Sequence, residues 1–295
     1  MVEVIQHLFD AVSAGSAYVL LGLGLTLVFS VMGLVNFAYG SLIVWGGYAL
    51  VSTLDTGAPY WLALLALLVG VTGLSWLMGA VAFRPFRNAP PATLLLTSFG
   101  VSLVLQALAS SLFGDTSRNV PFPRWLGNST SIGGVVVNAL QLVTVLGAIA
   151  VLIALYITLQ RTTLGLHIRA AAEDPDVSRL LGVNSSRVLA TVFIISGVIA
   201  AVVSFLWLAK TGTVNPRADL NPTLKAFIVV VIGGLGTIRG AVIGGLLLGL
   251  FESFLTAYLP ASLTNYQITG VFLILMFLLT ARPQGIAGRA LELSK

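Results

Sequence analysis

The chain has 295 residues, of which 57% are apolar and only 8% are charged. Soluble domains carry about 25% charged residues, so this composition excludes a water-soluble globule and predicts a polytopic membrane protein. The formal net charge of +5 does not indicate nucleic-acid binding, because the basic residues fall in short loops between apolar runs, where they orient a membrane protein.

Nine apolar runs, taken in chain order, predict one all-helical transmembrane domain over residues 1–295. A crossing needs about 20 helical residues, and most of the runs reach or approach that length. The runs are Leu8 to Val31, Phe37 to Leu54, Trp61 to Phe83, Thr93 to Phe113, Val135 to Leu159, Val188 to Ala209, Thr223 to Ile238, Ala241 to Leu259 and Tyr266 to Ala281. The run from Phe37 to Leu54 contains Gly40, Gly46 and Gly47, so a broken or re-entrant piece is the alternative there. That alternative leaves eight full spans and reverses the side of the N-terminus.

Clustered basic residues predict which loops face the cytoplasm. They are Arg84 and Arg87 in FRPFRNAPP, the arginines of residues 161–187, and Arg282, Arg289 and Lys295 near the C-terminus. Counting crossings between these clusters places the N-terminus and the loops 114–134 and 210–222 outside, with the C-terminus inside. The stretch MVEVIQHLFD has two acidic residues and no Lys or Arg, so no cleavable leader is expected. The outer loop GDTSRNVPFPRWLGNSTS suits contact with a periplasmic partner, or an ordinary aromatic belt.

The stretch RTTLGLHIRAAAEDPDVSRLLGVNSSR, residues 161–187, is the one long polar segment. Asp174 can cap a helix whose first residue is Pro175 and which Gly182 can close after about seven residues. Such a helix rises only about 10 Å and cannot cross a bilayer. Its apolar face consists of Val177, Leu180 and Leu181. An isolated helix this short is marginal, so it must dock on a second protein or, alternatively, on its own membrane domain.

Residues 26–50 and 226–250 align as an internal repeat, although chance similarity between apolar segments is the alternative. The aligned pairs are Val31 with Val231, Gly33 with Gly233, Gly40 with Gly240, Ile43 with Ile243 and Leu50 with Leu250. Each copy places a glycine-rich break between two apolar runs, which is how transporters line a pathway with irregular backbone. The glycines of the second copy also allow helices to approach closely; they are Gly236, Gly240, Gly244, Gly245 and Gly249.

Lys225 and Glu252 are the ionisable residues set most deeply inside apolar runs. If the two helices turn near Arg239, both side chains reach a depth of about 20 Å, where a buried charge demands a partner. We therefore predict an ion pair, acting either as a clamp between helices or as a gate or substrate contact. A Lys225 side chain that snorkels to water is the alternative.

Four stretches resemble the permease subunits of ABC importers for branched-chain amino acids. They are GLGLTLVFSVMGLVNFAYGSLIVWGGY, AFRPFRNAP, GLHIRAAAEDPDVSRLLGVNSSRV and TGTVNPRADLNPTLKAFIVVVIGGLGTIRGAVIGGLLLG, so the likeness covers nearly the whole chain. The resemblance implies an importer of the bacterial inner membrane with two related permease subunits, two cytoplasmic ATPases that hold ATP and Mg, and a periplasmic binding protein that delivers leucine, isoleucine or valine. The second permease is expected to be a different, related chain, and this chain binds no cofactor itself.

The resemblance also implies roles for individual residues. The ATPase-coupling interface would comprise Arg169, Glu173, Asp174, Arg179, Leu180, Leu181 and Gly182. Candidates for the translocation path or its gate are Asn36, Tyr39, Gly40, Ser41, Asn215, Lys225, Gly233, Gly234, Gly236 and Glu252.

One motif departs from the family pattern, which reads NFAHGE where this chain has NFAYGS, with Tyr39 and Ser41 in place of an ionisable pair. Urea, short amides and other hydrophobic amino acids are therefore alternative substrates. A secondary transporter or a channel, neither of which needs ATP, is the alternative from another class, because broken helices serve such proteins too. An enzyme is not expected, since the chain has no cysteine, its His7 and His167 lie far apart, and no GxxxxGK[ST] motif is present.

Overall fold

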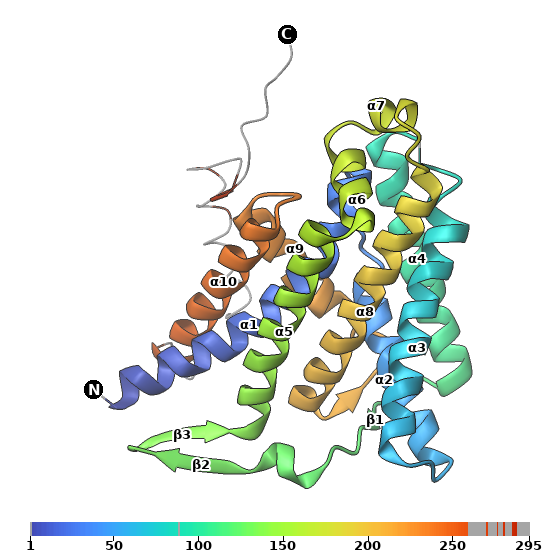
Figure 1. Cartoon of the computed structure of the whole chain (residues 1–295). Coiled ribbons are helices and arrows are strands. Elements are labelled where there is room, and N and C mark those ends of the chain that lie inside the picture. Colours follow the sequence, from blue (N-terminus) through green and yellow to red (C-terminus); the bar gives the residue numbers. More distant parts are fainter. Residues whose placement is uncertain are drawn as a thin grey trace.

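The computed structural model describes residues 2–87 and 89–258, and beyond these only residues 270, 276, 280 and 285–287. Within these residues the chain is a bundle of helices that run between two ends (Figure 1). The predicted ninth run, Tyr266 to Ala281, lies outside the described residues apart from single positions. The C-terminal cluster of Arg282, Arg289 and Lys295 lies wholly outside them.

Six described helices are long and apolar enough to cross a membrane. They are α1 (Val2–Met32), α3 (Tyr60–Met78) continued by the π-helical turn η1 (Gly79–Phe83), α4 (Pro91–Phe113), α5 (Ala139–Arg161), α8 (Ser185–Thr211) and α10 (Ile238–Tyr258). The shorter helices are α2 (Tyr39–Asp55), α6 (Thr163–Glu173), α7 (Pro175–Leu180) and α9 (Leu220–Gly233). The predicted all-helical, polytopic fold is confirmed.

Four short strands form two antiparallel ribbons at one end of the bundle. β1 (Arg118–Asn119) pairs with β4 (Thr213–Val214), and β2 (Ser129–Ile132) pairs with β3 (Val135–Asn138) after the 3₁₀ turn η2 (Arg124–Gly127). The prediction that a helical run begins at Val135 is therefore wrong at its start. Gly133 and Gly134, at φ of +60° and +86°, make the tight turn of the hairpin, and α5 begins only after Asn138, whose side chain caps it.

The loops group at the two ends as the arginine pattern predicted. At one end, Arg87 donates to Ser186 at 3.3 Å, which joins the loop after η1 to the start of α8. At the other, Gln6 exchanges two hydrogen bonds of 2.8 and 3.0 Å with the backbone of Val136, and the β1–β4 pairing ties the loops 114–134 and 210–222 together. The N-terminus therefore lies with those two loops and opposite α7 (Figure 1).

Packing is tightest between α1 and α10. A Cβ atom on Gly245 would lie 2.5 Å from the Val19 amide nitrogen, and one on Gly249 would collide with the backbone of Gly15. Small residues therefore let the two backbones touch, as the glycine spacing predicted. The outer helices instead expose leucines to the membrane, among them Leu96, Leu103 and Leu146 at 70%, 64% and 63% exposure.

Both aligned segments of the internal repeat contain a helix, a glycine break and a second helix. Gly33, at φ of +66°, ends α1, and Gly234 and Gly236, at +104° and +79°, separate α9 from α10. The run after the first break is not itself broken, because Gly46 and Gly47 lie inside the continuous helix α2. There they allow close contact with α8 rather than a turn.

Candidate translocation site

Two short helices begin at the same place inside the membrane domain. The amide of Gly40, in the first turn of α2, donates to Thr223 Oγ1 at 3.0 Å, and that hydroxyl donates to the Asp219 carbonyl oxygen at 2.7 Å. A side chain at Gly40 would collide with both oxygens, so glycine is required there. From this point α2 leads toward the strand-bearing end, where Asp55 lies 4.0 Å from Arg118, and α9 leads away from that end (Figure 1).

A buried carboxylate lies where these helices meet. Asp219 is 7% exposed, and its Oδ2 accepts hydrogen bonds of 2.8 Å from both Ser41 Oγ and Ser102 Oγ. Ser102 lies midway along α4, so the acid is held deep in the domain. We call these three residues the Asp219 cluster. Sequence reasoning placed Asp219 in an outer loop and missed it, because its partners come from elements far apart in the chain.

The second buried polar group is the ion pair predicted from equal depth. Lys225 Nζ lies 2.7 and 2.9 Å from the two carboxylate oxygens of Glu252, and the two side chains are 18% and 20% exposed. Tyr18 completes what we call the ion-pair cluster, donating to Glu252 Oε2 at 2.5 Å and accepting from Lys225 at 2.8 Å. The predicted pairing is confirmed, whereas Tyr18 was not foreseen.

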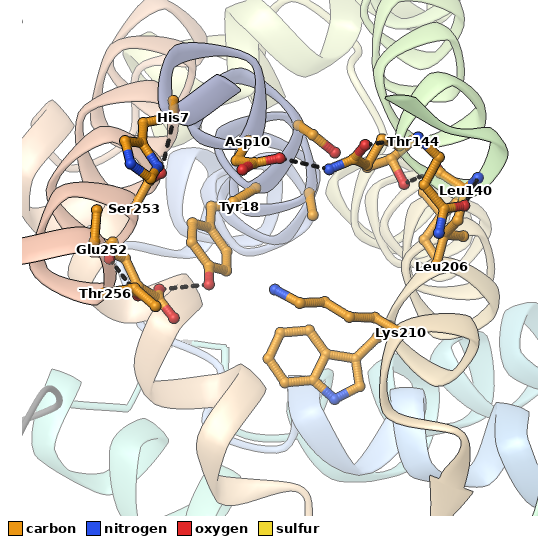
Figure 2. A pocket seen from close by; sticks show the side chains of 17 residues that line it. His7, Asp10, Tyr18, Leu140, Thr144, Leu206, Lys210, Glu252, Ser253 and Thr256 are labelled. Carbon is orange, nitrogen blue, oxygen red and sulfur yellow. Dashed lines mark hydrogen bonds between the residues drawn. The ribbon is translucent and has the colours of Figure 1, made fainter. Parts of the chain in front are cut away.

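A cavity of about 500 Å³ opens beside the ion-pair cluster, between α1, α5, α8 and α10. Its lining includes Tyr18 and Glu252, which lie next to each other (Figure 2), and Asn138 at the end of β3. The cavity therefore lies toward the strand-bearing end of the bundle. A mostly apolar pocket with a few convergent polar groups is the usual form of a small-molecule site.

Other residues predicted to line the path make contacts that support the fold. Asn36 is buried, and its side chain accepts from the Ala38 amide at 3.1 Å. The Tyr39 ring is fully buried against Gly24, and its hydroxyl has no hydrogen-bond partner among the described residues. Asn215 is half-buried and donates to Ser117 at 3.0 Å in the loops at the strand-bearing end, and it contacts neither cluster by a hydrogen bond among the described residues. The structure thus brings Gly40 and Ser41 to Asp219, and Lys225 to Glu252, but does not gather all the candidates at one site.

The glycine break after α9 frees backbone carbonyls inside the domain, as expected for an interrupted membrane helix. The amide of Ile286 donates to the carbonyl of Ile232, and that of Ala287 donates to the carbonyl of Gly233, both at 2.9 Å. Protein backbone therefore satisfies these two groups. Gly233 also packs against Gly240, where neither position has room for a side chain.

The predicted short helix of the polar stretch is present as α7, six residues long. The Asp174 side chain caps it by accepting from the amides of Asp176 and Val177 at 2.9 Å, and Gly182 follows its end at φ of +85°. Leu180 and Leu181 are 88% and 77% exposed at the tip. The part of the domain that the structure describes therefore leaves the apolar face of α7 uncovered.

A second helix, α6, precedes α7 and was not predicted. Thr162 caps it by accepting from the Gly165 amide at 3.1 Å. The Arg169 guanidinium donates to the Leu159 carbonyl oxygen, so this arginine ties α6 to α5 instead of projecting outward with α7. Glu173 is exposed at the end of α6, and Arg179 lies 3.2 Å from Asp176 on α7.

Broken helices, buried polar clusters and six long apolar helices are typical of a multi-pass membrane transport protein. The family model described as "Branched-chain amino acid transport system / permease component" matches residues 7–281. The chain belongs to this family, as its motifs predicted. It is accordingly a transport subunit without an ATPase domain, and not an enzyme.

Two relatives of known function align with nearly the whole chain, and a third aligns with about half of it. It is 33% identical to the high-affinity branched-chain amino acid transport system permease protein LivH of Escherichia coli K12, with 97% of this chain and 96% of LivH covered. It is 32% identical to the corresponding protein BraD of Pseudomonas aeruginosa, with the same coverage. The fructose import permease protein FrcC of Rhizobium meliloti is 28% identical over 55% of this chain and 45% of its own. No solved structure matches the chain at a significant level.

Proposed function

We propose that this chain forms part of the translocation path for leucine, isoleucine, valine or related hydrophobic amino acids, and that separate ATPase subunits drive it. The names and full-length coverage of LivH and BraD support the substrate class. The partial match to a fructose permease is weaker support for a sugar, because it covers about half of the chain.

The single observation that carries the proposal is the uncovered face of α7. Leu180 and Leu181 project at the end opposite the strand ribbons, on a capped helix too short to be stable alone. Exposed leucines rimmed by charges such as Arg179 and Asp176 suit a protein groove with a polar edge. A secondary transporter has no need of such a helix.

In the complete importer, two ATP-binding subunits hold ATP and Mg and dock at the α7 end, which faces the cytoplasm. A second permease, a related but different chain, completes the path, and a periplasmic binding protein meets the end that carries β2 and β3. The assembly lies in a bacterial inner membrane, with the C-terminus in the cytoplasm. The grouping of loops at the two ends, with arginines beside α7, supports this orientation.

The ion-pair cluster would close the inner part of the cavity and serve as a gate. Its charges are shielded from the membrane by each other and by the Tyr18 and Trp207 rings, which lie 4.8 and 5.8 Å from Lys225 Nζ. Ser41 and Tyr39 depart from the family motif within or beside the path, which keeps urea and short amides as the alternative substrates.

The test is to isolate the tagged chain gently from its source and to measure leucine uptake by the same cells. ATP-binding subunits should co-purify with the unaltered chain and be lost when Leu180 and Leu181 are both replaced by Asp. There are two matched controls. One replaces Leu180 and Leu181 by Met, and the other is Val136→Asp at the opposite end. Both should retain the ATP-binding subunits.

Uptake should stop when cellular ATP is depleted. Leucine uptake that survives both ATP depletion and the Asp pair would establish a secondary carrier and overturn the proposal. Uptake of urea or acetamide in place of leucine would retain the ATP-driven mechanism and change the substrate.

A further inference from the structure

The large cavity is lined by charges of both signs, contributed by different helices. Asp10 comes from α1, Lys210 from the last turn of α8 and Glu252 from α10 (Figure 2). Glu252 already has a cation, because Lys225 contacts both of its carboxylate oxygens. One carboxylate, on Asp10, and one ammonium group, on Lys210, therefore remain in the cavity without a counter-charge.

These two groups do not pair with each other. Asp10 Oδ1 accepts from the amides of Gln6 and Gln141 at 3.2 and 2.7 Å, and neither donor carries a charge. Lys210 Nζ makes no hydrogen bond and no ion pair with any residue that the structure describes. Figure 2 shows its amine directed into the cavity, on the side where Tyr18 lies.

Asp10 is half-buried and Lys210 is exposed, so both charges can be reached by a ligand that enters the cavity from the strand-bearing end. A free α-amino acid carries both charges on one carbon atom, a carboxylate that a lysine can bind and an ammonium group that a carboxylate can bind. A sugar, an amide or a simple anion supplies at most one of them. Apolar wall remains beside the charges for an aliphatic side chain, from Ala14, Ala17 and Leu206 and from the Trp207 ring.

We propose that this cavity is an outer binding site for the zwitterion of a free α-amino acid, with the α-carboxylate on Lys210 and the α-ammonium group on Asp10. The inference rests on the proposed import of hydrophobic amino acids and adds where the permease itself recognises the common backbone. The site lies on the strand-bearing side of the ion-pair cluster, so an arriving amino acid would occupy it before the gate opens.

The experiment measures weak binding to the purified assembly without its binding protein, by saturation-transfer difference NMR. The three probes are leucine, 4-methylpentanoate, which lacks the ammonium group, and 3-methylbutylamine, which lacks the carboxylate. Leucine should bind more tightly than either analogue by about tenfold, the effect expected for one hydrogen bond to a charged group.

Substitutions then assign each charge to its partner. Lys210→Gln should lower the affinity for leucine about tenfold and leave the affinity for 3-methylbutylamine unchanged. Lys210→Arg keeps the positive charge and should retain leucine binding. Asp10→Asn keeps an acceptor for Gln6 and Gln141. It should lower the affinity for leucine and leave the affinity for 4-methylpentanoate unchanged. Arg124→Gln removes an exposed basic residue at the same end outside the cavity, and should change nothing.

Leucine binding that is equal in Lys210→Gln, Asp10→Asn and the unaltered protein would overturn the inference, and so would the absence of any leucine signal. In either case ATP-driven leucine uptake that depends on Leu180 and Leu181 would leave the proposed function standing. If cells that carry the unaltered chain take up no leucine, the proposed function is refuted instead.

Discussion

The Asp219 cluster and the ion-pair cluster hold a buried acid in the same membrane domain by different means. Glu252 is neutralised by the ammonium group of Lys225 at 2.7 Å. Asp219 is surrounded by two hydroxyl donors at 2.8 Å, beside the first turns of α2 and α9. Charge balances charge in the first case, and dipoles solvate charge in the second. The two clusters should therefore respond differently when one partner is removed.

The largest effect is expected from Lys225→Met, because it leaves Glu252 buried without its cation. Breaking a buried pair from one side costs about 3–5 kcal/mol. We expect a marked fall in the thermal unfolding midpoint of the detergent-purified protein, together with lost yield. The double variant Lys225→Met with Glu252→Gln removes both charges and should recover most of the stability. Equal damage in the single and double variants would show that the two charges do not compensate each other.

Gly249→Ala tests the close approach of α1 and α10, the two helices that carry Tyr18 and Glu252 of the ion-pair cluster. The added methyl group would meet the Gly15 backbone, which cannot rotate aside, so the helices must separate. Overpacking of this kind costs about 1–3 kcal/mol. The same change at Gly73 on α3, where nothing lies within 4 Å, is the matched control and should cost nothing measurable. Unfolding midpoints compare the two, and equal values would contradict the packing argument.

How far the sequence predicts these features depends on how local their causes are. Most of the apolar runs, the grouping of the described arginine loops and the capped α7 rest on neighbouring residues, and the structure reproduces them apart from the helix start predicted at Val135. The ion pair was predictable because opposite charges at equal distances from a turn lie at the same depth on antiparallel helices and can meet. Asp219 was not, because the hydroxyls that make its burial tolerable come from Ser41 and Ser102, on two other helices.

Strands β2 and β3 were missed for a related reason. Val135, Val136 and Val137 are apolar and join the following helix in any hydropathy profile, and only the Gly133–Gly134 turn indicates a hairpin. The charges that line the cavity could not be predicted from the sequence either. Asp10 and Lys210 lie near the ends of their helices, where solvated residues are common, and only the assembled bundle directs them into one space.

Asp219→Ala should lower the free energy of unfolding by about 1–2 kcal/mol, less than Lys225→Met does. It leaves two hydroxyl groups without their acceptor, but it leaves no buried charge without a partner. Ser41 Oγ and Ser102 Oγ lie 3.0 Å apart, so one can donate to the other once the carboxylate is gone. Asp219→Asn keeps an acceptor and should cost less again. An Asp219→Ala loss as large as that of Lys225→Met, measured under the same conditions, would mean that the carboxylate balances a cation.

The smallest effect is expected from Tyr18→Phe, which removes one hydroxyl from the ion-pair cluster. Glu252 keeps both contacts to Lys225, so the loss should be about 1 kcal/mol, typical of a single hydrogen bond. In the Lys225→Met background, the Tyr18 hydroxyl remains as a donor to a carboxylate that has lost its lysine, and Tyr18→Phe should lower the free energy of unfolding by measurably more than in the unaltered protein. This coupling follows from a double-mutant cycle on unfolding midpoints. Additive losses would show that Tyr18 packs beside the pair without sharing its charge.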